Sequence, residues 1–210
     1  MMSQAGGMDV NALMQRLRRL ASLDTAVFDE VRTDANATVP SALVAVASTL
    51  LFGIGGWLWY LFSDLNDFDA YDGSGEFFLK SVIIGSILAI ALWAVWVAVT
   101  YVLLTQMFRA RADMSELLRV MGLASAPLAL GVLMFIPMLD FGIALTALAL
   151  MFGSTLIAVM RTTDADPGRV LVSTGAGFAV WAIVLGLLAT DDNVWSPGMF
   201  IFDSLKDNFL

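Results

Sequence analysis

Long hydrophobic stretches without a charged side chain alternate with short polar segments along this chain. Five such stretches occur, at residues 35–63, 81–108, 120–139, 141–160 and 170–190. Each contains about the 20 residues that a helix needs to cross the hydrocarbon core of a bilayer. The pattern therefore predicts an all-α fold, a membrane-embedded bundle of five transmembrane helices.

A polar segment with an amphipathic pattern precedes the first span. Residues 9–21 place apolar side chains at helical spacing, with Arg16, Arg18 and Arg19 largely on the opposite face. Such a helix can lie on an anionic inner leaflet or dock on the cytoplasmic face of the protein itself. Both interpretations stay open at this point.

The spans and their flanks divide the chain into three regions. Residues 1–39 form a cytoplasmic amphipathic segment, residues 40–190 the five-span membrane domain, and residues 191–210 an amphipathic tail on the outer face. In this tail Ser196 and Pro197 suit the start of a short helix, with Ser as the cap and Pro in the first turn. Amphipathic interfacial helices are therefore expected at both ends of the chain.

Positively charged side chains predict how the chain is threaded through the membrane. With the N-terminus inside, the outer side collects only Lys80 and Lys206, and the inner side collects nine arginines: Arg16, Arg18, Arg19, Arg32, Arg109, Arg111, Arg119, Arg161 and Arg169. Short cytoplasmic loops carry the excess of Lys and Arg in membrane proteins. We therefore expect a multi-pass protein of the plasma (inner) membrane, with a cytoplasmic N-terminus and an outer C-terminus.

The composition narrows the range of functions. Hydrophobic residues make up 59% of the chain and charged residues 14%, and the chain has no His and no Cys. Without imidazole or thiolate groups we expect no metal centre and no cofactor, and a net charge of −8 argues against nucleic-acid binding. Because no charged side chain lies inside a predicted span, the usual catalytic and proton-relay groups are missing there, and we expect no enzymatic activity.

A proline interrupts the third span near its centre. Pro127 follows Ala126, and Gly122 lies one helical turn earlier. Proline frees a backbone carbonyl and kinks a helix, and small residues let a neighbouring helix approach closely. A packing kink is the expected role, and a gating hinge is the alternative.

Three tryptophans lie deep in the spans, away from either membrane surface. Trp93 and Trp96 are about one turn apart in the second span, and Trp181 is in the fifth. A buried indole N–H needs a hydrogen-bond acceptor. Packing within the bundle is the simpler interpretation, and a groove for a lipid tail, a pigment or a partner helix is the other.

The connection between the first two spans is acidic. It carries five carboxylates: Asp64, Asp67, Asp69, Asp72 and Glu76. Calcium binds through several carboxylate oxygens, but this spacing departs from the EF-hand pattern. We expect a solvated acidic loop that offers a contact surface on the outer side, with a calcium site as the sharper hypothesis.

Two stretches of the chain resemble the Yip1 domain family of multi-pass membrane proteins. One is LDTAVFDEVRTDANAT, residues 23–38, directly before the first span, and the other is FRARADMSELLRVMGLASAP, residues 108–127. The resemblance covers roughly residues 20–190 and is closest to the bacterial type. It implies a five-helix bundle with a cytoplasmic N-terminus, and it carries no defined catalytic residues to this chain.

These features favour a non-catalytic integral membrane protein that acts as a scaffold, a membrane-organising element or an accessory subunit of a larger membrane complex. Its expected partners are the lipid bilayer and other membrane-protein subunits or further copies of itself. The alternative is a channel or permease for small neutral solutes or lipids, although we find no convincing internal repeat of the transporter kind. A packed bundle with an apolar outer groove would favour the first, and a continuous polar lumen the second.

Overall fold

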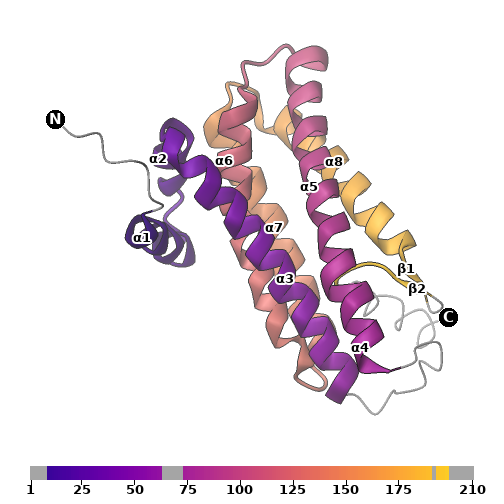
Figure 1. Cartoon of the computed structure of the whole chain (residues 1–210). Helices are drawn as coiled ribbons and strands as arrows, with labels where there is room; N and C mark the ends of the chain where they lie inside the picture. Colours follow the sequence, from indigo (N-terminus) through magenta and orange to yellow (C-terminus); the bar gives the residue numbers. More distant parts are fainter. Residues whose placement is uncertain (1–8, 63–72, 191–192, 199–210) are drawn as a thin grey trace.

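The computed structural model of the protein describes residues 9–62, 73–190 and 193–198, and in these ranges the chain is almost entirely helical (Figure 1). Five helical segments are long and apolar enough to cross a membrane: Ala35–Phe62, Ser74–Met107, Met114–Phe135, Asp140–Thr162 and Pro167–Leu187. The expected all-α bundle with five membrane-crossing helices is confirmed.

The spans are built from regular helices and from shorter segments with tighter or wider turns. The first is η1 (Ala35–Ala37) with α3 (Thr38–Phe62), and the second is α4 (Ser74–Phe77), η2 (Phe78–Ile84), α5 (Gly85–Val102) and η3 (Leu103–Met107). The third is α6 (Met114–Ala124) with η4 (Ala126–Phe135), and the last two are α7 (Asp140–Thr162) and α8 (Pro167–Leu187). Segments η2 and η3 are π-helical, whereas η1 and η4 are 3-10 helices.

The third span begins earlier than the uncharged stretch predicts. Because Asp113 caps α6 by accepting hydrogen bonds from the backbone N–H groups of Ser115 and Glu116, the helix starts at Met114 and includes Arg119. Arg119 is only 8% exposed. The expectation that no charged side chain lies inside a span is therefore wrong for the outer turns of the helices, which extend beyond the uncharged runs. Glu116 and Arg119 lie in the third span, and the second, fourth and fifth contain Glu76, Lys80, Asp140, Arg161 and Arg169 near their ends.

The first and third spans pack backbone to backbone through glycines. A Cβ atom built on Gly55 of α3 would lie 2.0 Å from the carbonyl oxygen of Gly131 in η4, and a Cβ on Gly131 would lie 2.1 Å from the ring of Phe52. A Cβ on Gly122 of α6 would lie 2.6 Å from the carbonyl oxygen of Ser41. Such contacts between small residues are the usual way in which membrane helices approach closely, because lipid supplies no hydrophobic drive to associate.

The N-terminal segment folds as α1 (Val10–Ala21) and α2 (Val27–Thr33) beside one end of the bundle (Figure 1). Arg16 and Arg19 of α1 pair with Glu30 of α2, and Arg16 also pairs with Asp34, the residue that follows α2, at 2.7 Å. Arg16 donates a hydrogen bond to the Asp34 carboxylate, which holds the pKa of that group below its usual value. Residues 9–21 are thus docked on the protein itself, although Val10 and Met14 still face outward.

The chain after α8 returns into the bundle. Strands β1 (Ala189–Thr190) and β2 (Asn193–Val194) form a small antiparallel hairpin, after which Ser196, Pro197 and Gly198 bend and are buried. The hydroxyl of Ser81 donates to the carbonyl oxygen of Ser196 at 3.1 Å. Gly85 of α5 makes room for this bend, because a Cβ there would lie 3.0 Å from the Pro197 nitrogen. The short helix expected to start at Ser196 and Pro197 is not seen at these residues, which form the bend, and the rest of the expected tail, residues 199–210, lies outside the described residues.

Candidate functional site

The break in the third span packs tightly against the first. Helix α6 ends at Ala124, and Ala126 and Pro127 open the first turn of η4. Gly122, before the break, lies against Ser41 of α3, and Gly131, after it, lies against the Phe52 ring of α3. A side chain added at either glycine would meet an atom of α3, so the contacts favour the packing kink over a gating hinge.

The deep tryptophans connect α5 to α8. The indole N–H of Trp96 donates to the carbonyl oxygen of Thr174 at 2.9 Å, and that of Trp181 donates to the carbonyl oxygen of Ala89 at 3.1 Å. Phe178 lies between them, with ring centroids 5.2 Å from Trp96 and 5.8 Å from Trp181. The two N–H groups therefore find acceptors inside the bundle, which is what the packing interpretation requires.

Trp93 differs from the other two tryptophans. It is 9% exposed, and among the described residues its indole N–H has no hydrogen-bond partner. A groove for a lipid tail, a pigment or a partner helix stays a prediction at this position.

Replacing Trp96 by phenylalanine should lower the free energy of unfolding by about 1 kcal/mol, because it removes one buried hydrogen bond between α5 and α8. The measurement is thermal unfolding of the purified protein in a mild detergent. Trp57→Phe is the matched control, since its indole donates to Ser74 at an exposed position. Equal shifts in the two variants would contradict the role of Trp96 as an interhelical link.

Most of the acidic contact loop lies outside the described residues. Asp64, Asp67, Asp69 and Asp72 belong to that part, while Glu76 lies in α4 and pairs with Lys80. Among the described residues no group of three or more acidic or histidine side chains could hold a metal ion. The contact surface and the calcium site at this loop therefore stay predictions.

A polar cleft lies at the arginine-rich end of the bundle. It has a volume of about 580 Å³. It lies between the end of α2, the α5–α6 connection with the start of α6, and the end of α7 with the connection that follows. The lining residues are Arg32, Thr33, Arg111, Ala112, Asp113, Glu116, Thr162, Thr163 and Asp164. Sequence reasoning missed this cleft, because three segments far apart in the chain build it. The sequence does predict that all these segments lie on the same side of the membrane, and this was the one indication that they could meet.

Two arginines hold the segments around this cleft together. Arg119 donates to the carbonyl oxygen of Arg32 at 2.6 Å, and Arg32 in turn donates to the carbonyl oxygen of Arg161 at 3.1 Å. The guanidinium of Arg119 also bonds the hydroxyl of Ser115 at 2.7 Å. The hydrogen bonds of the buried Arg119 guanidinium therefore go to backbone and hydroxyl oxygens and not to a carboxylate.

Some charged groups in the cleft already have partners and others do not. Asp113 caps α6, and its hydrogen bond from the Ser115 hydroxyl holds the pKa of the carboxyl below its usual value. Asp164 accepts a hydrogen bond from the backbone N–H of Arg111 at 2.7 Å. The Nε atom of Arg32 is buried and has no acceptor among the described residues. The cleft therefore combines a free donor with carboxylates.

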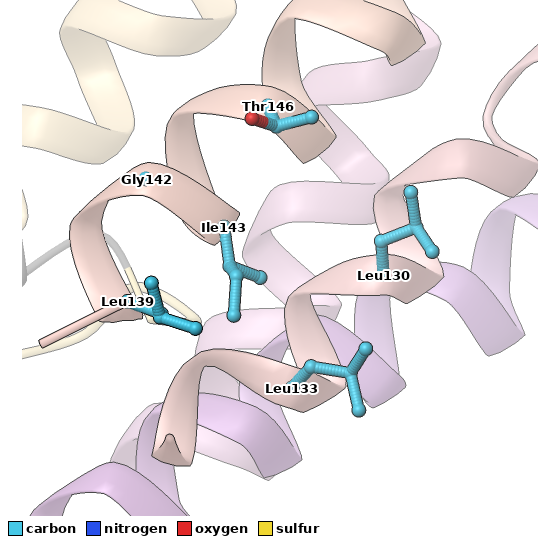
Figure 2. A pocket seen from close by; sticks show the side chains of 6 residues that line it. All are labelled: Leu130, Leu133, Leu139, Gly142, Ile143 and Thr146. Carbon is cyan, nitrogen blue, oxygen red and sulfur yellow. The ribbon is translucent and has the colours of Figure 1, made fainter. Parts of the chain in front are cut away.

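A second cavity, an apolar groove, opens on the outside of the bundle between η4 and α7. It has a volume of about 390 Å³, and Figure 2 shows the residues that line it, Leu130, Leu133, Leu139, Gly142, Ile143 and Thr146. Leu130 and Leu133 belong to η4. After η4 the chain reverses direction, so that α7 runs back beside it (Figure 1). The groove lies in the half of the bundle away from the arginines.

Comparison with known proteins agrees with the arrangement of spans. The model of the Yip1 domain matches residues 24–191, which include α2 and all five spans. No match is found among curated proteins or among solved structures. The match covers most of the chain, including residues 24–38 and 108–127 of the two stretches that carried the resemblance, and on this ground the chain belongs to the Yip1 domain family.

Proposed function

We propose that the protein is a non-catalytic membrane scaffold, which serves as an accessory subunit of a larger membrane complex. The observation that carries this proposal is a packed bundle with an apolar groove on its outer surface. The glycine contacts between α3 and η4 close the interior on one side, and Trp96 and Trp181 join α5 to α8 on the other. The groove is thereby left as a surface for a neighbour.

A transmembrane helix of another subunit fits the chemistry of this groove. Leu130, Leu133 and Leu139 offer aliphatic side chains that are more than 40% exposed, and Gly142 lets a neighbouring backbone approach because a Cβ there would meet nothing within 4 Å. Thr146 adds one hydroxyl that can bond across the interface. Small residues with an occasional hydroxyl are typical of helix–helix contacts in lipid.

The proposed orientation places the arginine-rich end in the cytoplasm of a plasma membrane. Contacts support a common location for the inner segments, since Arg161 pairs with Asp29 at 2.7 Å and Arg111 bonds Asp164. All nine arginines of the chain are at this end of the helices, and Lys80 is at the other. By the excess of positive charge in cytoplasmic loops, the N-terminus is inside and the C-terminus outside.

A permease for small neutral solutes or lipids is the second candidate. The observation in its favour is a set of hydroxyls buried on α5 and α8 that have no hydrogen-bond partner among the described residues, Ser86, Thr100, Ser173 and Thr174. Such groups are costly in a dry interior and would be relieved by a polar solute or by water. They do not form a lumen that crosses the bundle by themselves, so the scaffold stays the main proposal.

Filling the groove tests the proposed function. Thr146→Trp should prevent a partner helix from docking, whereas Ile157→Trp, an exposed position farther along α7, should not. Both variants and the unaltered protein would be purified in mild detergent, and the co-eluting subunits identified by mass spectrometry. We expect a stoichiometric partner, or a second copy, that is lost only from Thr146→Trp. A lone protomer in every preparation would contradict the proposal.

A further inference from the structure

The polar cleft lies at the ends of the helices that are long and apolar enough to cross a membrane. Thr162 is the last residue of α7, Asp113 immediately precedes α6, and Thr33 ends α2 just before the first span. In a bundle whose spans cross the bilayer, the ends of the helices are at the level of the phosphates. A cleft of about 580 Å³ at this depth is within the usual size range of small-molecule sites.

Groups of both charges with unused hydrogen-bonding capacity line this cleft. The Nε–H of Arg32 is buried without an acceptor, and an unsatisfied buried donor on a charged group is costly. Glu116 lines the same cleft, and its side chain makes no hydrogen bond or ion pair among the described residues. Asp113, in contrast, accepts three hydrogen bonds and Asp164 accepts one. A ligand that carries an anion and a hydrogen-bonding cation would meet the Arg32 guanidinium and the Glu116 carboxylate at once.

We propose that the cleft binds the headgroup of a zwitterionic phospholipid with a primary ammonium group, a phosphoethanolamine. The phosphate oxygen accepts from the guanidinium of Arg32, because Arg presents planar donors that suit phosphate oxygens. The ammonium donates to Glu116. Thr33, Thr162 and Thr163 surround the headgroup with hydroxyls.

The same chemistry separates this headgroup from two other common ones. A choline headgroup has no N–H to give to Glu116, and its recognition usually relies on aromatic rings, which do not line this cleft. An anionic headgroup such as phosphatidylglycerol offers no cation and would meet the carboxylates of Glu116, Asp113 and Asp164. The site is thus expected to prefer ethanolamine lipids over both.

Native mass spectrometry of the full-length protein in detergent tests this inference. Dioleoyl lipids with ethanolamine, choline and glycerol headgroups would be titrated separately, so that the acyl chains are equal. We expect phosphatidylethanolamine to bind about tenfold more tightly than phosphatidylcholine, the ratio that corresponds to one charge-assisted hydrogen bond. Equal binding of the two lipids, or tighter binding of phosphatidylglycerol, would overturn the proposal.

Three variants assign the preference to the cleft. Glu116→Gln keeps the shape of the side chain but removes its charge, and should abolish the preference for ethanolamine while leaving the protein folded. Arg32→Gln should weaken binding of both zwitterionic lipids, and Arg169→Gln, an exposed arginine at the same end that does not line the cleft, should change neither. A preference that persists in Glu116→Gln would place the lipid elsewhere, and binding that free inorganic phosphate displaces equally well would point to a soluble anion; either result overturns the inference.

Discussion

Gly55→Ala is expected to destabilise the protein by about 3 kcal/mol, at the upper end of the range for overpacking a close contact. The added methyl carbon would lie 2.0 Å from the carbonyl oxygen of Gly131. The two next nearest atoms, the carbonyl carbon of Gly131 and the Cα of Val132, are also backbone atoms. Because backbone atoms cannot rotate away as a side chain does, α3 and η4 must separate. The loss would be measured as a lower midpoint of thermal unfolding in detergent and a smaller yield of monodisperse protein.

Gly153→Ala is the matched control for this change. Gly153 is also within a spanning helix, α7, but a Cβ there would meet nothing within 4 Å. Alanine is the better helix former, so this variant should be neutral or more stable by about 0.5–1 kcal/mol. If both alanine variants unfold at the same temperature, the close packing of the first and third spans is not what holds the bundle together.

Arg119→Met is expected to lower the free energy of unfolding by about 2 kcal/mol, the cost of leaving buried acceptors without their charged donor. Methionine retains much of the apolar stem but cannot donate to the carbonyl oxygen of Arg32 or to the hydroxyl of Ser115. The N-terminal segment should loosen first, because the hydrogen bond that joins the carbonyl oxygen of Arg32 to α6 is lost. Limited proteolysis between α2 and α3 would report this before global unfolding.

The control for the second change is Arg18→Met. Arg18 lies on α1, it is exposed, and it has no ion pair among the described residues. Surface substitutions of this kind usually change stability by less than about 0.5 kcal/mol. Proteolysis at the same rate in Arg119→Met and in the unaltered protein would show that the buried guanidinium does not hold α2 to the bundle.

The five spans could be predicted from the sequence because the bilayer constrains them directly. Hydrocarbon requires a long run without charges, and each such run became a helix. The grouping of the arginines could be predicted for the same reason, since the order of the spans decides which connections meet. The contacts of Arg161 with Asp29 and of Arg111 with Asp164 follow from that order.

The details that shape the sites depend on contacts between distant segments. Nothing near Gly131 indicates that it faces Gly55, and nothing near Ser196 indicates that its carbonyl meets Ser81. The pattern of charges alone predicts that Arg119 lies outside the third span, whereas Asp113 caps the helix and makes it start earlier. Three segments far apart in the chain form the polar cleft, so its position depends on how they are arranged in space.

The proposed orientation places the arginine-rich end of the bundle inside the cell, and cysteine labelling tests this most directly. The chain has no native cysteine, so single substitutions report one position each. Gly75→Cys and Gly168→Cys are suited, because both glycines are exposed with open space around them, at opposite ends of the bundle. When intact cells are treated with a membrane-impermeant maleimide, we predict labelling at residue 75 and none at residue 168. Residue 168 should become labelled only after the membrane is permeabilised. The reverse pattern, or labelling of both in intact cells, would contradict the account.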